Sequence, residues 1–503
     1  MSEACAGSGT VHVSSWSRKR LRPRIVHLGL GAFYRAHVAL YGEDVLDQKG
    51  GDWGIVGASL QRSDLRDRLA PQDNLYLAVE RSGVSDRFRI VRSLLGVHFA
   101  PENPGALVSR LGDPATDIVT LTVTEKGYCL DRGTGRLDEH HPDIVNDRSN
   151  PDKPRTAVGF LAAALRRRRM AGLAPFTIMS CDNLPANGRL LKTCVTDFLA
   201  LSDESTAKWV EANGAFPSTL VDRIVPATTT ADVEAVTAAT GLCDRAPVIH
   251  EPFRQWVIED CFVRHDRPAW EDVGAELVSD VTPYETMKLR LLNGAHSALA
   301  YPGYLAGYET VSEALADTDL RNFVRALWAE TAPTLEPPPG FDVQAYVTQV
   351  EQRFANPGIR HRTWQIASDG SQKLPQRLLA PAEERLMKDL PVPCVAVVVA
   401  SWIVYVGGTD LHGRAIDVRD SLASNLRAAI TAAGDVAGKI HAALAFKEIF
   451  GEKLPADRRF VDAVTAAYVS LTSEGGQAAA RRAANGMSGQ RHPGIAMDMK
   501  DYR

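Results

Sequence analysis

The stretch that decides the fold is Ile25-Val26-His27-Leu28-Gly29-Leu30-Gly31, and a helical segment follows it from about Arg35. This order predicts a strand, a tight turn and a helix. Such a turn lets the backbone approach a pyrophosphate, and the helix N-terminus adds N–H donors and partial positive charge. Tyr34 stands where the third glycine of the full motif would be. The motif is therefore incomplete, and an ordinary strand–helix turn stays open as the alternative.

Further strands are indicated outward from this turn, at 55–58, 117–123 and 176–180, with a helix over 157–171. Strands that alternate with helices predict a parallel sheet covered on both faces. After about residue 283 the β-branched runs give way to Ala/Leu/Arg segments at helical spacing, and the apolar run 392–406 fits a buried core helix. We therefore expect an α/β chain: an arm over 1–23, a Rossmann-type cofactor-binding domain over 24–282 and a mostly α-helical domain over 283–503.

Composition excludes several classes of function. Hydrophobic residues make up 45% and charged residues 23% of the 503 residues, and the formal net charge is −4. This balance gives no electrostatic footprint for nucleic acid or an anionic membrane. The 7 cysteines form no Cys-x-x-Cys pair, and the first residues hold no apolar stretch of signal-peptide type. We expect a cytoplasmic protein without a disulfide framework. The basic run 166–169 is expected to be a solvated helix face.

The end of the second strand bears on cofactor choice. An acid there would bind the ribose of NAD, whereas a basic residue would suit the additional phosphate of NADP. The strand runs into Ser59-Leu60-Gln61-Arg62-Ser63-Asp64, so Arg62 comes first and the acid is late. These residues leave the choice between NAD and NADP open.

The segment 284–296 carries the most chemical information. At helical spacing Glu285, Lys288 and His296 fall within one arc, with Asn293 beside it. In an apolar cleft, burial lowers the pKa of a lysine toward the range of a general base, and an asparagine amide can hold an alkoxide. The alternative is that these residues face solvent. The inward stripe of the helix would then be Tyr284, Met287, Leu291 and Ala295.

At this point the chain resembles the polyol-specific long-chain dehydrogenases, the mannitol dehydrogenase family, over nearly its whole length. The resemblance rests on the segments 29–37 (GLGAFYRAH), 122–128 (TVTEKGY), 180–183 (SCDN), 221–226 (VDRIVP), 250–260 (HEPFRQWVIED) and 369–373 (DGSQK), and on the Lys288/Asn293/His296 spacing. It implies a metal-independent dehydrogenase with a Rossmann-type domain followed by a helical domain. The implied cofactor is NAD, with NADP not excluded, and the implied partner is a small sugar acid or polyol.

The resemblance also implies roles for individual residues. Lys288 would be the general base, Asn183 and Asn293 the oxyanion hole, His296 and Asp222 the groups that position substrate and base, and Glu285 the gate for proton movement. Cofactor contacts would come from Gly29, Gly31, Ala32, Phe33, Arg35, Thr124, Glu125 and Lys126. Lys373 would contact the far end of the substrate, and Arg360 and Arg362 are candidates to bind a substrate carboxylate.

Within the family, the stretch His361–Ala367 (HRTWQIA) is similar to fructuronate reductases, which are also named D-mannonate oxidoreductases. Mannitol dehydrogenases tend to carry an Arg at the position of Gln365, which argues against a mannitol enzyme. Mannitol 2-dehydrogenase and arabinitol dehydrogenase stay open as alternatives, and a non-catalytic nucleotide-binding sensor is more remote. A zinc enzyme is suggested only by Asp138-Glu139-His140-His141, between Gly133 and Gly135 on one side and Pro142 on the other. A surface loop is the favoured interpretation there.

Overall fold

The computed structural model describes residues 11–131 and 134–488. The chain divides into two compact units, Met1–Thr282 and Pro283–Arg503, called unit 1 and unit 2 below. Residues 1–10 of the expected arm, together with Gly133, lie outside the described residues. The rest of that arm is partly regular, because it contains strand β1 (Val11–Val13) and the start of strand β2 (Arg22–Leu28).

Unit 1 is built on a parallel sheet of five strands in the order β10-β7-β2-β3-β6. Four of these strands were predicted, and β6 is additional because Gly96 and His98 interrupt its apolar residues. The strand bounds are β2 (Arg22–Leu28), β3 (Trp53–Ser59), β6 (Leu94–Phe99), β7 (Ile118–Leu121) and β10 (Thr177–Ser180).

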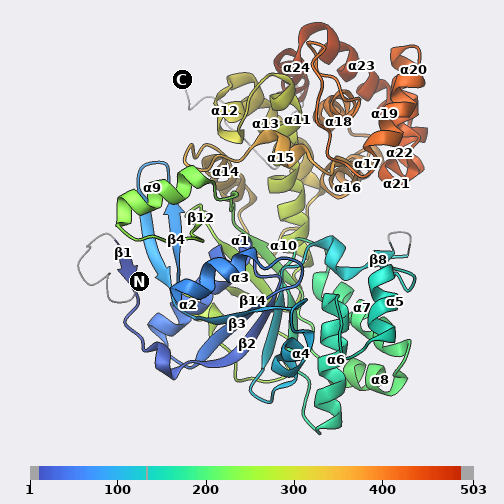
Figure 1. The fold of residues 1–503 in the computed structure, drawn as a ribbon. Coiled ribbons are helices and arrows are strands. Elements are labelled where there is room, and N and C mark those ends of the chain that lie inside the picture. The colour runs from blue at the N-terminus through green and yellow to red at the C-terminus, as the bar shows by residue number, and fades with distance from the viewer. Residues whose placement is uncertain (1–10, 132–133, 489–503) are drawn as a thin grey trace. The chain divides into compact units, whose positions relative to one another are not determined.

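Both faces of this sheet are covered, because its apolar side chains alternate in direction. Val26, Val119 and Ile178 lie in register and pack in one core with residues of α4, α6 and α7. Ile25 and Ile118 belong to a second core with residues of α1 and α2. Figure 1 shows α6 and α7 on one side of the strands and α2 on the other. The predicted Rossmann-type arrangement is confirmed. The helices of unit 1 are α1 (Ala32–Ala36), α2 (Val38–Gln48), α3 (Asp64–Leu69), α4 (Pro104–Gly112), α5 (Pro142–Ser149), α6 (Ala157–Met170), α7 (Asn187–Ala200), α8 (Glu204–Asn213) and α9 (Thr230–Thr240).

Unit 1 also contains smaller sheets that the sequence did not indicate. One has the order β1-β5-β4-β12 and another the order β11-β13-β14, and β8 pairs with β9. These strands are short and carry many charged residues, as in Asp86–Val91 (DRFRIV), so the sequence gives no strong strand signal for them. Their bounds are β4 (Tyr76–Arg81), β5 (Asp86–Val91), β8 (Leu130–Asp131), β9 (Arg136–Leu137), β11 (Thr219–Asp222), β12 (Val248–His250), β13 (Gln255–Glu259) and β14 (Glu276–Val278).

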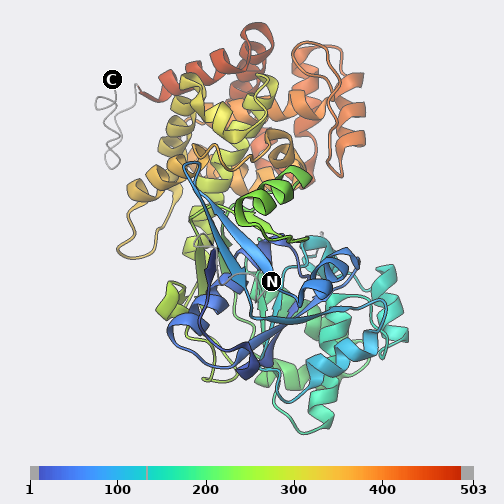
Figure 2. The ribbon, with the colours of Figure 1, turned by 60° about the vertical axis from the view of Figure 1, so that its left-hand side comes forward.

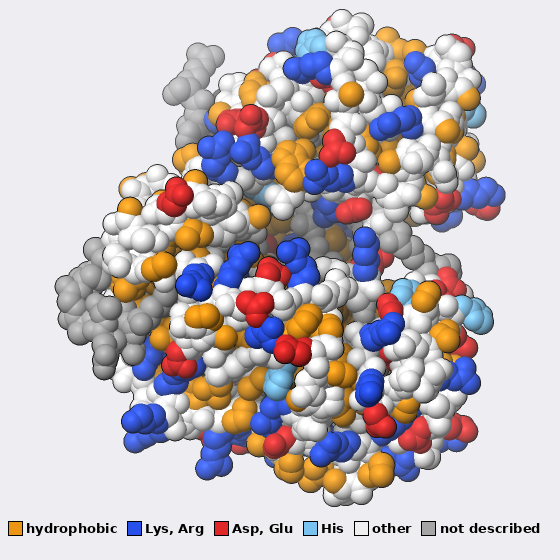
Figure 3. Space-filling view, in the orientation of Figure 1, with side chains coloured by type: hydrophobic (Ala, Val, Ile, Leu, Met, Phe, Trp, Pro, Cys, Tyr) orange, Lys and Arg blue, Asp and Glu red, His pale blue; other side chains and the backbone are white. Residues whose placement is uncertain are grey.

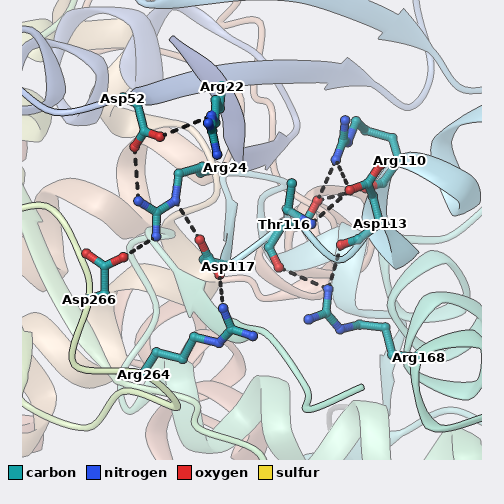
Figure 4. A network of polar contacts seen from close by, with 11 residues as sticks. Arg22, Arg24, Asp52, Arg110, Asp113, Thr116, Asp117, Arg168, Arg264 and Asp266 are labelled. Carbon is teal, nitrogen blue, oxygen red and sulfur yellow. Dashed lines mark hydrogen bonds and ion pairs between the residues drawn. The ribbon is translucent and has the colours of Figure 1, made fainter. Parts of the chain in front are cut away.

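A network of arginines and aspartates ties the central sheet together near the amino ends of its strands (Figure 4). Arg24 of β2 donates to Asp117, which directly precedes β7, at 2.7 Å, and Arg264 binds the same carboxylate at 3.0 Å. Arg168 is 1% exposed and donates to the carbonyl oxygens of Asp113 and Thr116. The expectation of a solvated face over 166–169 is therefore wrong for Arg168. In open parallel α/β sheets ligands bind outside the carboxyl ends of the strands, which is the edge opposite this network.

In its described part unit 2 is mostly α-helical, as predicted, with loops between the helices, and Figure 2 shows it in yellow to red. Its centre is α18 (Pro393–Val406), whose residues Cys394–Val406 are all buried, so the predicted core helix is confirmed. The other elements are α10 (Thr282–Met287), η6 (Lys288–Asn293), α11 (Gly294–Leu305), α12 (Val311–Ala316), α13 (Thr318–Thr331), α14 (Val343–Phe354), α15 (Thr363–Ala367), α16 (Gly370–Leu374), η8 (Pro375–Leu379), α17 (Ala380–Leu386), α19 (Ala423–Ala432), α20 (Val436–Leu444), α21 (Lys447–Phe450), α22 (Lys453–Ala456), α23 (Arg458–Glu474) and α24 (Gly476–Ser488).

The surface carries charges of both signs. On the face drawn in Figure 3, Lys and Arg side chains are interspersed with Asp and Glu over both units. Among the described helices, none combines the length and apolarity needed to cross a membrane.

Candidate active site

The glycine turn lies at the carboxyl end of β2, in the middle of the central sheet. Gly29 has φ +87°, and its N–H and that of Leu30 both donate to the carbonyl oxygen of Ala58, at 2.9 and 3.1 Å. A Cβ on residue 29 would lie 2.2 Å from the carbonyl oxygen of Thr122 on the neighbouring strand. Both the backbone angle and the close approach therefore require glycine.

A pocket of ≈ 1310 Å³ opens at this turn within unit 1. Six of the eight predicted cofactor residues line it: Gly29, Gly31, Ala32, Arg35, Thr124 and Lys126. Phe33 instead packs against the core around α1 and α2 and stacks on His37 at 5.0 Å. Glu125 begins a short 3₁₀ helix, Glu125–Tyr128, and is not among the residues that line the pocket.

The pocket is predominantly basic. Among the described residues that line it, only Asp64 and Asp143 are acidic, whereas six are basic: Arg35, Arg62, Arg68, Lys126, Arg155 and Arg245. Arg62 is held by Asp64, with 3.0 Å between Nε and Oδ1, and Arg68 approaches the other oxygen of that carboxylate. The excess of cations suits a ligand with several negative charges. Arg62, whose position after the second strand favoured NADP, is thus paired with Asp64 of the same loop.

Asp182, a residue for which the sequence suggested no role, holds Val123 and Thr124, which line the pocket. Its carboxylate accepts hydrogen bonds from the N–H groups of Val123 and Thr124, at 3.1 and 2.8 Å, and from the hydroxyl of Tyr128. These bonds hold Thr124 at φ +64°. Asn183 follows Asp182 at the carboxyl end of β10 and is exposed. The signal that marks Asp182 is its position two residues after the end of the buried strand β10.

Asp222 ends strand β11 and is buried. Its chain neighbour Arg223 is also buried and donates to the carbonyl oxygens of Ala36 and Phe253. The Nε2 atom of His37 lies 2.8 Å from the carbonyl oxygen of Gln255, and burial lowers the pKa of His37 to about 3. This imidazole is therefore neutral at pH 7.

The second group of predicted residues lies on α10, η6 and α11 of unit 2. Lys288, Asn293 and His296 are only 7%, 5% and 6% exposed, and Glu285 is also buried. The solvent-facing alternative is therefore wrong. The regular helix assumed for this segment is also wrong, because residues 288–293 form a π-helix. A π-helix bonds residue i to i+5 and occurs frequently at functional sites, and here it places Lys288 and Asn293 one turn apart.

His296 lies in a tight ring cluster. Its imidazole stacks on Phe354, with ring centroids 4.2 Å apart, and meets His361 edge-on at 5.0 Å. Burial is the main cause that lowers the pKa of His296 well below its usual value and that of His361 to about 4, so both rings are neutral at pH 7. Among the described residues, His296 Nε2 and Asn293 Nδ2 are buried and have no hydrogen-bond partner. These two atoms are available to a ligand.

The predicted substrate-binding residues separate into two groups. Lys373 lies on α16 beside the cluster, and its Nζ donates to the carbonyl oxygens of Ile366 and Ser368, at 3.1 and 2.5 Å. Burial, and after it the charge of Arg377, lowers the pKa of Lys373 to about 8. Arg360 is exposed and Arg362 is partly buried, and both pair with the carboxylate of Glu309 in unit 2.

Arg377 was missed by sequence reasoning. It lies one helical turn after Lys373, and its Nη1 is 3.3 Å from both the carbonyl oxygen of Asn293 and the hydroxyl of Ser297. The four-residue spacing from Lys373 is the signal that would have found it.

The segment 138–141 is a turn, as the favoured interpretation expected. The carboxylate of Asp138 accepts a bond from the N–H of His140 at 3.0 Å, and His141 Nδ1 accepts from the N–H of Asp143 at the start of α5. Within the described ranges, no group of three or more His, Cys, Asp or Glu side chains is arranged to hold a metal ion.

The chain belongs to the mannitol dehydrogenase family. Residues 23–272 match the mannitol dehydrogenase Rossmann domain, and residues 280–472 match the mannitol dehydrogenase C-terminal domain. These matches confirm the predicted family and the predicted order of an α/β and a helical part. They also make the chain an oxidoreductase by family.

Individual relatives cover almost the whole chain. The D-mannonate oxidoreductase of Escherichia coli (strain K12) is 45% identical over 466 residues, which is 92% of this chain and 96% of the relative. A mannitol 2-dehydrogenase of Aspergillus fumigatus is 39% identical over 94% of this chain and 95% of its own length. Among solved structures, the Pseudomonas fluorescens mannitol 2-dehydrogenase in its ternary complex with NAD and D-mannitol has a TM-score of 0.86 at 37% identity, covering 94% of this chain and 97% of that one.

Proposed function

We propose that this chain is a fructuronate reductase, which interconverts D-mannonate and D-fructuronate with NAD as the cofactor. The observation that carries the proposal is the buried group Lys288, Asn293 and His296, which offers a base and two unpaired polar atoms. The relative of highest identity quoted above is a D-mannonate oxidoreductase, at 45% against 39% for the mannitol enzyme. Mannitol 2-dehydrogenase and arabinitol dehydrogenase activities are the alternatives that the test below separates.

The pocket of unit 1 fits the proposed cofactor. Its ≈ 1310 Å³ exceeds the range of about 300–1,000 Å³ typical of small-molecule sites. A Cβ on Gly31 would meet only the carbonyl oxygen of Gly29, at 3.7 Å, so the turn is open where a pyrophosphate would approach. When bound, the nicotinamide supplies the hydride acceptor of the oxidation. Asp64 holds Arg62 and offers carboxylate oxygens to a ribose hydroxyl, which favours NAD over NADP.

Lys288 is proposed as the general base. Oxidation of a secondary alcohol releases one hydride and one proton, and in this proposal the hydroxyl proton moves to the amine of Lys288. Glu285 lies one helical turn before Lys288 and is also buried, so we assign it the transfer of that proton toward solvent. A base in this position typically contributes about 10²–10⁴ to the rate.

The two asparagines are proposed to stabilise the alkoxide. The Nδ2 of Asn293 is a buried donor without a partner in the described chain, and a substrate oxygen would supply one. Asn183, at the carboxyl end of β10, is the second proposed donor. Neutral His296 is proposed to bind a substrate hydroxyl, and Asp222 to position the base. Lys373, Arg360 and Arg362 remain candidates for the far end of the substrate.

The test is a comparison of kcat/KM for D-mannonate, D-mannitol and D-arabinitol, each with NAD and with NADP. We expect D-mannonate with NAD to be preferred by about a hundredfold or more, since a desolvated carboxylate needs a charged hydrogen-bond partner. A higher kcat/KM for D-mannitol would reject the sugar-acid assignment and favour the polyol alternative. Binding of NADH without turnover of any sugar acid or polyol would favour a nucleotide-binding sensor.

A further inference from the structure

Two π-helical segments of unit 2 meet at the proposed catalytic residues. The first is η6, with Lys288 and Asn293, and the second is η8 (Pro375–Leu379), with Arg377. The two segments pack against each other, and Nη1 of Arg377 lies 3.3 Å from the carbonyl oxygen of Asn293. Two such segments in contact are unusual, because π-helices are rare and concentrate at functional sites.

The guanidinium of Arg377 lacks a counter-charge. Its only hydrogen bonds are two long ones from Nη1, to Asn293 and Ser297, and no carboxylate of the described residues pairs with it. Two other arginines of unit 2 differ: Arg290 binds Glu384 through two nitrogens, and Arg325 binds Glu351 in the same way. Arg377 is partly buried, so its cation has lost part of its hydration without gaining a counter-charge, which favours an anionic partner supplied from outside.

The residues around Arg377 carry more positive than negative charge that is free to act on a ligand. Burial lowers its pKa to about 10, which leaves it charged at pH 7. Its positive charge lowers the pKa values of Lys373, His361 and His296. The carboxylates of Asp369 and Asp420 act to raise the pKa of Lys373, and that of Asp420 is already bound to the N–H and hydroxyl of Ser371. This side of unit 2 therefore favours an anion over a neutral polyol.

We infer that Arg377 binds the carboxylate of the sugar-acid substrate and thereby sets the preference for sugar acids over polyols. This inference rests on the proposed function, and it assigns the carboxylate to a residue other than Arg360 and Arg362. Those two arginines already contact the carboxylate of Glu309, and Arg360 and Glu309 are exposed, so solvent screens their charges. A guanidinium suits the task because its planar fork binds a carboxylate through two parallel hydrogen bonds.

The test is a cycle of two enzymes and two substrates. Wild type and Arg377→Met are each assayed with D-mannonate and with D-mannonamide, in which the carboxylate is replaced by a neutral amide. We expect wild type to favour D-mannonate about a hundredfold in kcat/KM, and Arg377→Met to lose most of that preference. Because the readout is the ratio of kcat/KM for the two substrates, a general loss of activity does not affect it.

Further variants keep the test decisive. Arg377→Lys retains the charge but loses the fork, so it should keep part of the preference even if Arg377→Met fails to fold. Arg458→Met, at the exposed surface of α23, is the matched control and should keep the wild-type ratio. Loss of the preference in Arg362→Met, with Arg377→Met unchanged, would overturn the inference, as would a wild type without any preference for the carboxylate. Absence of D-mannonate turnover by wild type would instead reject the proposed function, and with it the inference.

Discussion

The two glycines of the turn should fail in different ways when each is replaced by alanine. In Gly29→Ala the new Cβ would lie 2.2 Å from the carbonyl oxygen of Thr122, and the residue would have to keep φ +87°. The left-handed conformation costs about 1–2 kcal/mol and the overpacking about 1–3 kcal/mol, which together lower the free energy of unfolding by about 2–5 kcal/mol. In Gly31→Ala the Cβ meets only one atom, at 3.7 Å, with φ −125°. We expect nearly unchanged stability there, but cofactor affinity reduced about tenfold or more, because the methyl group occupies the cofactor's space.

Thermal unfolding and NADH titration by protein fluorescence measure these two effects separately. Gly50→Ala is the matched control for backbone strain, since Gly50 has φ +74° and no neighbouring atom within 4 Å of its added Cβ. It should lose only about 1–2 kcal/mol, the cost of the left-handed conformation. The reasoning would be refuted if Gly29→Ala were as stable as Gly50→Ala, because the contact with Thr122 would then carry no cost. It would also be refuted if Gly31→Ala bound NADH as tightly as wild type.

Four further outcomes are expected. Lys288→Ala should lose turnover by about 10²–10⁴ while it still binds NADH, and near-normal turnover would remove Lys288 from the mechanism. Asn183→Ala and Asn293→Ala should each lower kcat by about 10²–10³, because the alkoxide charge develops along the reaction path; a rise in KM alone would reassign that residue to ground-state binding. Asp64→Asn should raise kcat/KM for NADP relative to NAD, since Arg62 loses its partner, and an unchanged ratio would exclude this loop from cofactor choice. Affinity for sugar acids should fall as the pH rises through about 8, where Lys373 loses its charge, and Lys373→Arg should remove this step.

The candidate site shows which of its residues a local sequence pattern can predict and which it cannot. The sequence offered burial of Lys288, Asn293 and His296 as one of two interpretations, because leucines lie among these polar residues, and the structure buries all three. Arg377 was missed, since its four-residue spacing from Lys373 is a weak signal and its lack of a counter-charge is visible only in the structure. The error at Arg168 has the same origin: its partners are the carbonyl oxygens of Asp113 and Thr116, more than 50 positions away.

The sequence by itself determined the strand, turn and helix around Gly29, the α/β and helical order of the chain, and the family. These depend on hydrophobic periodicity and on short motifs, which are local properties of the chain. Only the tertiary structure decided that residues 288–293 form a π-helix, that Arg62 is paired with Asp64, and that Arg360 and Arg362 share Glu309. The physical reason is that a charge's environment depends on which distant residues pack beside it, and the residue types of one segment do not specify those neighbours.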